Sequence, residues 1–187
     1  TDGPVLIVAG PGSGKTRVLT HRVAYLIAAR KAAPYQILAL TFTNKAALEM
    51  KDRIRRLVHD DAGGNIWMGT FHSVFARILR SEAHVIGYPS NFTIYDTDDS
   101  KMLVKTIVKE MNLDEKLYKA NVVFNRISGA KNRLISWQEY TKNPVYQADD
   151  EAALRPKIGE IYKEYSLRCF KAGAMDFDDL LLRTNEL

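Results

Sequence analysis

The residues best suited to chemistry form a short glycine-rich stretch near the start of the chain. Its sequence, Ala9-Gly-Pro-Gly-Ser-Gly-Lys-Thr16, places three glycines directly before a lysine and a threonine. Glycine has no Cβ, so the backbone can wrap closely around a phosphate and aim its N–H groups inward, where a following helix adds its positive end. The Lys15 ammonium would reach the β- and γ-phosphates, and the Thr16 hydroxyl would hold Mg²⁺. The stretch therefore predicts a nucleoside triphosphate site.

This stretch departs from the general pattern G-x-x-x-x-G-K-[ST] at one position, because Ala9 stands where the first glycine would be. Alanine is sterically close to glycine, so the loop can still form. The alternative is a glycine-rich turn that binds nothing. Against that alternative, the apolar run before the loop and the amphipathic segment after it supply the strand and helix that a phosphate loop requires.

The two flanking segments belong to a longer alternation of apolar runs. Val5–Ala9 is too short for a helix and too apolar for a surface strand, so it predicts a strand buried on both faces. Apolar residues at spacings of three and four over residues 18–27 predict a helix that ends at Lys31–Pro34. Ile37–Leu40 predicts a second buried strand, and the order strand, helix, strand implies a right-handed parallel crossover. These segments predict an α/β nucleotide-binding core.

Two further segments repeat one order of residue types after a predicted strand. Thr41-Phe-Thr-Asn-Lys45 follows the second strand, and Thr70-Phe-His72 follows a third strand at Ile66–Gly69, which comes after a turn over His59–Gly64. Ligands bind at the carboxyl ends of parallel strands, so we expect these segments and the phosphate loop to share one edge of the sheet. Hydroxyls and helix N-termini suit phosphates, and aromatic faces suit unstacked bases. Together they would form a track for a single nucleic-acid strand.

Both segments also have a purely structural interpretation. Thr43 or Asn44 can cap the helix predicted to run to Val58, and His72 can serve as a cap or as a hydrogen-bonding residue of the core. Phe42 fits this interpretation poorly, because it is an aromatic residue placed where a strand emerges toward a ligand. From the residues alone, both interpretations stay open.

Composition excludes several other classes of protein. The chain has 187 residues, of which 46% are apolar and 26% charged, as in an ordinary soluble globular domain. No apolar run approaches the roughly 18 residues of a membrane span, and no charged start leads into a signal-like segment, so we expect a cytoplasmic protein with no membrane partner. The single Cys169 excludes an internal disulfide framework, and its apolar helical surroundings predict a buried core residue.

The formal net charge of +5 is unevenly distributed. Residues 1–95 carry 12 Lys and Arg against 6 Asp and Glu, whereas residues 96–187 carry 15 against 16. The positive excess therefore lies beside the phosphate loop, where it would attract a polyanion. A surplus of this size is also common in proteins that never touch nucleic acid.

The second half of the chain begins with a short predicted strand. Phe92–Asp96 has strand character, and Thr97–Asp99 can cap the helix that follows. On that helix Lys101, Lys105 and Lys109 recur every four residues. They could face a DNA backbone, although a solvated helix face is the favoured interpretation.

The remaining segments predict a mainly helical region. Leu113–Trp137 has helical character, Asn143–Ala148 resembles a loop, and the apolar residues between Ile158 and Cys169 predict a long helix that stops at Gly173. The aspartates within 176–179 start a last helix. They suit the dipole of that helix, so capping is favoured over metal binding.

Several of these segments together resemble a known family. Ala9–Leu26, Leu40–Met50 and Gly69–Ser73 resemble motifs I, Ia and Ib of the Rep/PcrA/UvrD family of superfamily 1 DNA helicases, in family order and at family-like spacing. Ile127–Asn132 resembles a segment of that family's 1B subdomain. Met175–Leu181 is similar to the stretch where the family's chain re-enters its first motor domain.

The resemblance implies an α/β fold with a RecA-like P-loop NTPase core and a parallel sheet, interrupted by a mainly helical insertion subdomain. It implies that residues 1–96 form the first part of motor domain 1A, that residues 97–173 form the insertion subdomain 1B, and that residues 174–187 return into domain 1A. The match extends over nearly the whole chain.

The resemblance also implies a function: the N-terminal part of an ATP-dependent DNA helicase that moves three-prime to five-prime on single-stranded DNA and acts at single/double-strand junctions, with ATP and Mg²⁺ as cofactors. Lys15 and Thr16 would be its catalytic residues, with Thr16 holding Mg²⁺ through ATP. The implied nucleotide-binding residues are Ala9, Gly10, Pro11, Gly12, Ser13, Gly14, Lys15, Thr16 and Arg17. The implied DNA-binding residues are Thr41, Phe42, Thr43, Asn44, Lys45, Thr70, Phe71, His72, Lys131 and Asn132.

Two other classes of protein share the phosphate loop. A small nucleotide kinase should carry an arginine-bearing lid and an acceptor pocket, and neither is recognisable. A regulatory or scaffold P-loop protein would bind nucleotide without coupling it to DNA. Within residues 1–187 we also find no Asp-Glu strand for magnesium and water, no arginine finger and no adenine-contacting glutamine segment, so we expect this piece alone to bind ATP weakly and to turn it over near background.

Overall fold

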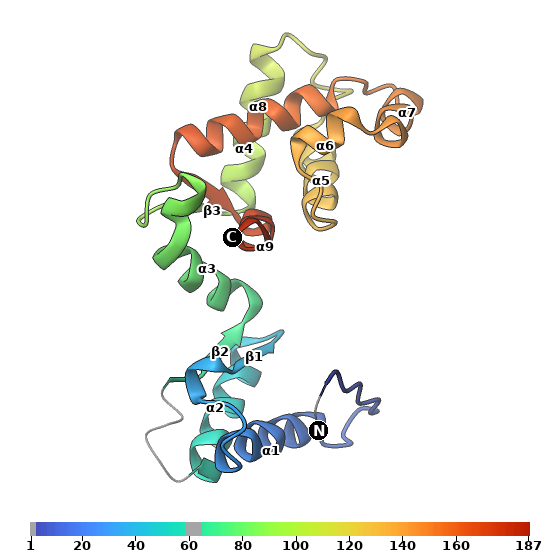
Figure 1. Ribbon diagram of the computed structural model, residues 1–187. Coiled ribbons are helices and arrows are strands. Elements are labelled where there is room, and N and C mark those ends of the chain that lie inside the picture. Colours follow the sequence, from blue (N-terminus) through green and yellow to red (C-terminus); the bar gives the residue numbers. More distant parts are fainter. Residues whose placement is uncertain (1–2, 59–64) are drawn as a thin grey trace. The chain divides into compact units, whose positions relative to one another are not determined.

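The computed structural model describes residues 3–58 and 65–187, which form two compact units. One unit extends to Val74, and the other runs from Phe75 to Leu187. Each combines helices with a short parallel sheet (Figure 1), so the predicted mixed α/β class is confirmed. None of the helices in the described ranges is long and apolar enough to cross a membrane. The turn predicted over His59–Gly64 lies outside the described residues.

The first unit is built on two parallel strands joined through a helix. Its elements are α1 (Lys15–Ala28), the 3₁₀ turn η1 (Pro34–Gln36), β1 (Leu38–Thr41), α2 (Asn44–Val58), β2 (Trp67–Thr70) and the start of α3 (Phe71–Glu82). β1 and β2 pair in parallel, from Leu38 opposite Trp67 to Thr41 opposite Thr70. Both strands were predicted, and each lies one residue later than its predicted range.

The core of the first unit lies between these strands and the helices α1 and α2. It consists of Val23, Ile37, Ala39, Met50, Ile54 and Ile66. Burial alternates along β1, because Ala39 is 3% exposed whereas its neighbour Leu38 is 51% exposed. The strand predicted as buried at Ile37–Leu40 is therefore buried on one face only, as the two-residue period of a strand allows.

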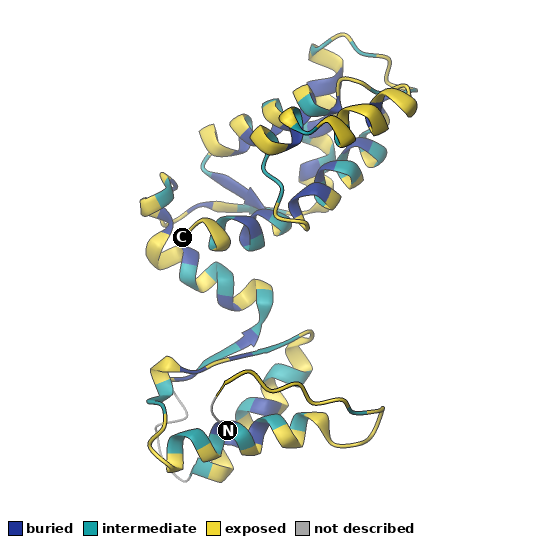
Figure 2. Ribbon diagram, turned by 45° about the vertical axis from the view of Figure 1, so that its right-hand side comes forward, coloured by how far each residue is buried: buried dark blue, intermediate teal, exposed yellow. Residues whose placement is uncertain are grey.

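The segment before the glycine-rich loop forms no strand. Val5–Ala9 pairs with neither β1 nor β2, and both Leu6 and Val8 are 90% exposed. Figure 2 shows this segment exposed over most of its length. Apolar side chains alone do not make a strand, because its N–H and C=O groups need a neighbouring strand as partner. The predicted buried strand at Val5–Ala9 is wrong, and so is the predicted crossover from it to Ile37–Leu40; the parallel pair in the described part of this unit is β1 with β2.

The second unit surrounds another pair of parallel strands with helices. Its elements after α3 are the 3₁₀ turn η3 (Ala83–Ile86), β3 (Thr93–Tyr95), α4 (Thr97–Glu110), α5 (Ala120–Lys131), α6 (Trp137–Lys142), α7 (Pro144–Ala152), α8 (Ile158–Lys171), β4 (Ala174–Asp176) and α9 (Phe177–Glu186). β3 pairs with β4, with Thr93 opposite Ala174 and Tyr95 opposite Asp176. Helices α4 to α8 therefore lie between the two strands of this sheet in the sequence, because α4 follows β3 and α8 precedes β4.

Helices α4, α5 and α8 enclose the largest core of the second unit. Val104, Val123 and Ile127 are fully buried in it. The predicted apolar face of α8 is confirmed, because Ile158, Ile161, Tyr162, Tyr165 and Cys169 are all at most 1% exposed. The helix ends before Gly173, which adopts a φ of 59° that favours glycine.

The loop predicted at Asn143–Ala148 is a helix instead. Asn143 caps α7, because its side-chain oxygen accepts a hydrogen bond from the Val145 N–H at 2.9 Å. Pro144 occupies the first helical position, where its missing N–H costs nothing and its fixed φ suits the helix. The Asn-Pro pair therefore starts a helix here. The helical region predicted over Leu113–Trp137 contains α5, with non-helical turns on both sides.

Two aspartates cap helices that follow strands. Asp96 caps α4, and its Oδ1 accepts the N–H groups of Asp98 and Asp99 at 2.8 Å each. The cap is thus Asp96, one residue before the predicted range Thr97–Asp99. Asp176 caps α9 in the same way and accepts the Asp179 N–H at 2.8 Å, which confirms the predicted capping at that end.

Candidate nucleotide and nucleic-acid site

The glycine-rich loop has a conformation that depends on its glycines. Gly12 has a φ of 74° and Gly14 a φ of 86°, in the left-handed region that residues with a Cβ disfavour. The Ser13 hydroxyl and its N–H both donate to the carbonyl oxygen of Gly10, at 2.6 and 3.3 Å, and close the turn. These contacts shape the loop before any ligand binds.

Lys15 turns back across this loop. Its Nζ donates to the carbonyl oxygens of Gly10 at 2.8 Å and of Ala9 at 3.4 Å. The first turn of α1 contains no acidic residue, so no carboxylate on that turn neutralises the ammonium or the positive end of the helix. The Lys15 charge is therefore held at the loop by two carbonyl oxygens, with no carboxylate of that turn beside it.

The start of α1 also presents free backbone donors. Gly14 caps the helix with no side-chain hydrogen bond, and the first amides of a helix have no partner inside it. A cavity of about 500 Å³ lies beside the loop, and its walls include Gly12, Gly14 and Arg17. The backbone amides of the loop and the Arg17 guanidinium at this cavity fit a chain of phosphates, and Lys15 and Thr16 follow Gly14 directly in the chain, outside the cavity lining.

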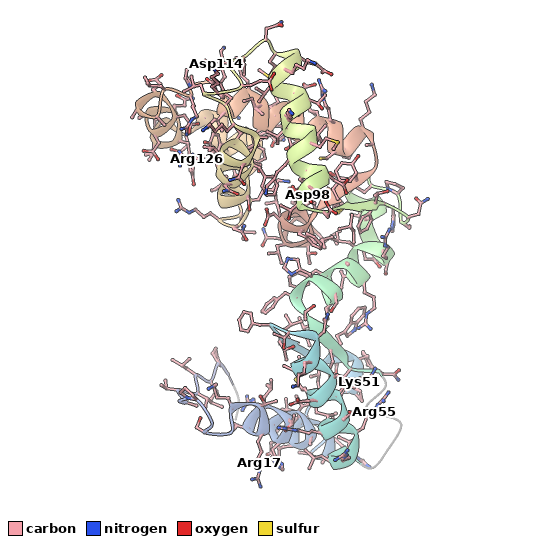
Figure 3. All side chains as sticks on the ribbon, turned by 180° about the vertical axis from the view of Figure 1, so that it is seen from behind. Arg17, Lys51, Arg55, Asp98, Asp114 and Arg126 are labelled. Atoms are coloured by element: carbon pink, nitrogen blue, oxygen red, sulfur yellow. The ribbon has the colours of Figure 1, made fainter. Side chains whose placement is uncertain are left out.

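A second cavity extends this cationic surface along α1 and α2. It has a volume of about 420 Å³ and is lined by Arg17, Thr20, His21, Arg53, Arg56 and Leu57. Figure 3 shows Arg17 extending away from α1. The sequence-based site omits His21, Arg53 and Arg56. The sequence pattern that points to these residues is helical spacing: Arg17 and His21 are four residues apart and Arg53 and Arg56 are three apart, which places each pair on one helix face.

The carboxyl ends of β1 and β2 meet, as predicted. Thr41 lies opposite Thr70 at the end of the parallel pair, so the two segments that follow these strands lie side by side. The rings of Phe42 and Phe71 have centroids 5.7 Å apart and are tilted by 40°. Phe42 is 92% exposed, which leaves most of its surface to a ligand.

The hydroxyls at this edge have structural partners within their own turns. Thr43 Oγ1 accepts the Ala46 N–H at 3.2 Å, so the predicted cap at the start of α2 is present. Thr70 Oγ1 lies 3.0 Å from Ser73 Oγ and accepts the Ser73 N–H at 3.3 Å. These bonds fix both turns, while His72 and the side chains of Asn44 and Lys45 are exposed beside them.

The phosphate loop does not join this edge. The segment that precedes the loop, Val5–Ala9, pairs with neither strand, so the loop is not held at the carboxyl end of a strand. The expectation that all three segments share one sheet edge is wrong for the loop and right for the Thr41 and Thr70 segments.

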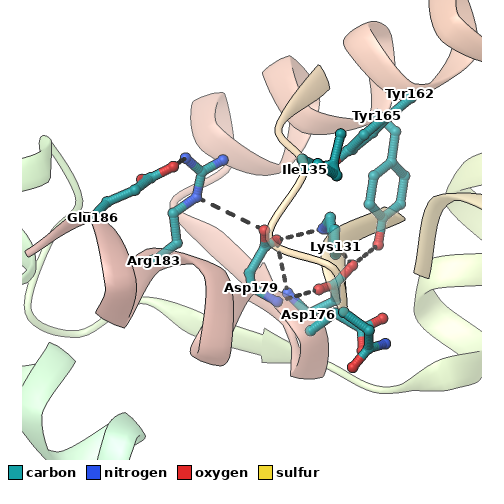
Figure 4. A network of polar contacts seen from close by, with 10 residues as sticks. Lys131, Ile135, Tyr162, Tyr165, Asp176, Asp179, Arg183 and Glu186 are labelled. Atoms are coloured by element: carbon teal, nitrogen blue, oxygen red, sulfur yellow. Dashed lines mark hydrogen bonds and ion pairs between the residues drawn. The ribbon is translucent and has the colours of Figure 1, made fainter. Parts of the chain in front are cut away.

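Lys131 lies inside the second unit, with a side chain that is 1% exposed (Figure 4). Its Nζ contacts Asp176 Oδ2 at 2.7 Å and Asp179 Oδ2 at 2.9 Å. The Tyr165 hydroxyl donates to the same Asp176 oxygen at 2.7 Å. Arg183 lies 3.7 Å from the other oxygen of Asp179, so two cations face two buried carboxylates.

This arrangement sets the protonation of the cluster. Burial alone would lower the pKa of Lys131, but Asp179 and Asp176 outweigh it and raise that pKa. Burial would likewise raise the pKa of Asp176, but the Lys131 ammonium holds it below its usual value. Lys131 therefore stays charged and paired with these carboxylates, so its buried ammonium is not available to a DNA phosphate.

Asn132 contacts the same part of the chain from an exposed position. Its Nδ2 donates to Asp178 Oδ1 at 2.9 Å and to the Ser128 carbonyl at 2.9 Å. The segments around Lys131 and around Asp176 thus bind each other. The sequence suggested a separate role for each segment, because nothing in their spacing indicates that residues more than forty positions apart meet.

Comparisons with known proteins cover the whole chain. Residues 1–187 match the family of UvrD/REP helicase N-terminal domains. The chain is 50% identical to the ATP-dependent DNA helicase UvrD1 of Mycobacterium leprae over 97% of its length, and 45% identical to the ATP-dependent DNA helicase PcrA of Bacillus subtilis over all of it. It covers 23% and 24% of these two proteins, so it spans about a quarter of the length of such curated relatives.

Proposed function

This chain belongs to the UvrD/REP helicase N-terminal domain family, and we propose that it is the N-terminal, ATP-binding and DNA-contacting part of an ATP-dependent DNA helicase. The whole protein would move three-prime to five-prime on single-stranded DNA and act at single/double-strand junctions, in the cytoplasm. The curated relatives that are 43–50% identical to this chain are named ATP-dependent DNA helicases, which supports this proposal.

The loop from Ala9 to Thr16 would hold the phosphates of ATP. Its amides and the Lys15 ammonium would bind the β- and γ-phosphate oxygens, and Arg17 would bind the same nucleotide from the first turn of α1. The Thr16 hydroxyl would hold Mg²⁺, which supplies neutralisation of phosphate charge when bound. To receive the nucleotide, Lys15 must release the two carbonyl oxygens that it now contacts.

The observation that carries the DNA part of the proposal is the aromatic pair at the end of β1 and β2. Phe42 is 92% exposed and lies against Phe71, where Thr41 and Thr70 pair. Exposed aromatic faces bind unstacked bases without regard to sequence. The proposed contact residues at this edge are Thr41, Phe42, Thr43, Asn44, Lys45, Thr70, Phe71 and His72, with Asn132 as a further contact in the second unit.

We also propose a RecA-like core with an inserted helical subdomain. The pairing of β3 with β4 supports this arrangement, because residues 97–173 form the part of the chain between these two neighbouring strands. The proposed boundaries are 1–96, 97–173 and 174–187. They differ from the division into compact units after Val74, because helix α3 continues into the second unit and packs with it.

Phe42→Ala in the full-length parent protein tests the DNA part of the proposal. Base stacking on an aromatic ring contributes about 1–3 kcal/mol, so affinity for a single-stranded oligonucleotide should fall about 5- to 150-fold. Tyr35→Ala is the matched control, because Tyr35 is an exposed aromatic residue of the same unit, 67% exposed, outside the proposed site. Fluorescence anisotropy with a labelled oligonucleotide measures both.

Equal DNA affinity and equal DNA-stimulated ATP turnover in wild type and Phe42→Ala would contradict the proposal. That result would favour a P-loop protein that binds nucleotide without coupling it to DNA. A loss in Phe42→Ala that is absent from Tyr35→Ala supports the edge as a DNA contact.

A further inference from the structure

Three lysines on α4 form a row that the proposed site does not use. Lys101, Lys105 and Lys109 stand four residues apart in one helix, so their Cα atoms rise along its axis in steps of about 6 Å. The core-facing side of α4 is formed by residues such as Val104 and Ile107, both 0% exposed. The lysines lie away from that side, and Lys105 and Lys109 are exposed.

The row carries its charge without carboxylate partners. None of the three lysines forms an ion pair with another residue in the described ranges, whereas the neighbouring Glu110 pairs with Arg168 on α8 at 2.6 Å. The acidic residues Asp98 and Asp99 lie in the first turn of α4, where they offset the helix dipole. Like charges at this spacing repel and weaken a helix, so helix stability does not account for the row.

An apolar side chain accompanies the row. Met102 is 70% exposed, although it belongs to a helix whose other large apolar residues are at least partly buried. Its position three residues before Lys105 makes it a neighbour of that lysine on the helix surface. A flexible thioether next to a line of ammonium groups can contact the sugar and base edges of a strand whose phosphates the lysines bind.

We propose that α4 binds the phosphate backbone of a DNA strand through Lys101, Lys105 and Lys109. The row extends over about 12 Å, which matches three to four phosphates at about 3.4 Å of axis per phosphate. Such contacts position a strand and do not read its sequence. The inference rests on the proposed helicase function and adds to it a track on the second unit, separate from the edge at Phe42.

The test replaces all three lysines with glutamine in the full-length parent protein. The matched control replaces Lys116, Lys142 and Lys171, three exposed lysines of the same unit that lie off α4 and lose the same total charge. Binding of a labelled single-stranded oligonucleotide and of a tailed duplex is measured from 50 to 300 mM salt. Loss of three phosphate contacts should reduce the slope of log K against log salt by about 2–3, because each contact contributes about 0.7–0.9.

A reduced slope in the α4 variant with an unchanged slope in the control supports the inference. A reduction with both DNAs assigns the row to the single strand, and a reduction with the tailed duplex alone assigns it to the duplex. Equal slopes in the two variants overturn the inference. If DNA still stimulates ATP turnover by the wild type, the proposed function stands without the α4 inference. If the wild type neither binds DNA nor changes its ATP turnover with DNA, both the proposed function and the α4 inference are wrong.

Discussion

Lys131 connects two distant segments of the second unit through buried ion pairs. As part of a Lys-Asn pair that resembles a helicase segment, it suggests a DNA contact. In the structure its ammonium group is 1% exposed and lies between the carboxylates of Asp176 and Asp179. It joins the end of α5 to the start of α9, so its contribution is to the packing of the second unit.

Replacing Lys131 with methionine should lower the free energy of unfolding by about 3–5 kcal/mol at pH 7, because two buried carboxylates would lose their main partner. Denaturant unfolding of the second unit measures this. Lys116→Met is the control, because Lys116 is exposed and its replacement should change stability by less than about 0.5 kcal/mol.

The pH dependence of this effect has a definite sign. Lys131 holds the pKa of Asp176 below its usual value, so the stability from this pair is present above about pH 4 and is lost as pH falls through the depressed pKa. In Lys131→Met, burial without the cation raises the pKa of Asp176. Protonation of Asp176 then removes its buried, unpaired charge and stabilises the variant. The stability gap between wild type and variant should therefore shrink between pH 7 and pH 4, and a gap that widens would contradict the account.

Individual elements differ in how far the sequence predicts them. β1 and β2 were predictable because each is a short apolar run directly followed by a helix with its own cap, and α8 because its apolar residues recur at helical spacing. Val5–Ala9 has an equally strong apolar pattern, but a strand needs a hydrogen-bonding neighbour that composition does not specify. For α7 the same local signal, Asn143-Pro144, can end one segment or start the next, and here Asn143 caps the helix that begins at Pro144.

The residues of the candidate site also differ in how far the sequence predicts them. The residues of the phosphate loop and of the Thr41 and Thr70 segments follow from local pattern, and the pairing of two strands brings the last two together. His21, Arg53 and Arg56 were missed because they come from two helices whose packing no single segment indicates. The pairing of Lys131 with Asp176 was missed for the same reason, since it joins distant segments.

The junction of β2 and α3 gives a test at the scale of elements. A Cβ on Gly69 would lie 2.5 Å from Ser73 Oγ and 3.0 Å from Val74 Cγ2, so Gly69→Ala should destabilise the protein by about 1–3 kcal/mol. Because Thr70 and Phe71 follow directly, DNA affinity should fall as well. Thermal unfolding and oligonucleotide binding measure the two effects.

Gly129→Ala is the control for that substitution. Gly129 lies within α5, and a Cβ there would meet nothing within 4 Å. Alanine should therefore stabilise the helix by about 0.5–1 kcal/mol. If Gly69→Ala were as stable as wild type, the close contact between β2 and the first turn of α3 would not exist in solution.

For the whole molecule, the proposed nucleotide site and the proposed nucleic-acid surface lie on a chain that spans about a quarter of the length of its curated relatives. The positive charge excess lies in residues 1–95, beside the phosphate loop and the Phe42 edge, as expected if both ligands are polyanions. The prediction that residues 1–187 alone turn over ATP near background also belongs to this scale. It stays a prediction that DNA-stimulated hydrolysis by the isolated piece would refute.

The central claim is that ATP bound at the glycine-rich loop is coupled to DNA, and steady-state ATP turnover by the full-length parent protein tests it most directly. Turnover is measured with and without single-stranded DNA for wild type, Lys15→Ala and the exposed-lysine control Lys171→Ala. We predict that DNA strongly stimulates wild type and the control, and that Lys15→Ala lowers turnover about 100-fold or more under both conditions, because it removes a cation that would contact the transferring phosphate. Wild-type turnover that is indifferent to DNA would contradict the account.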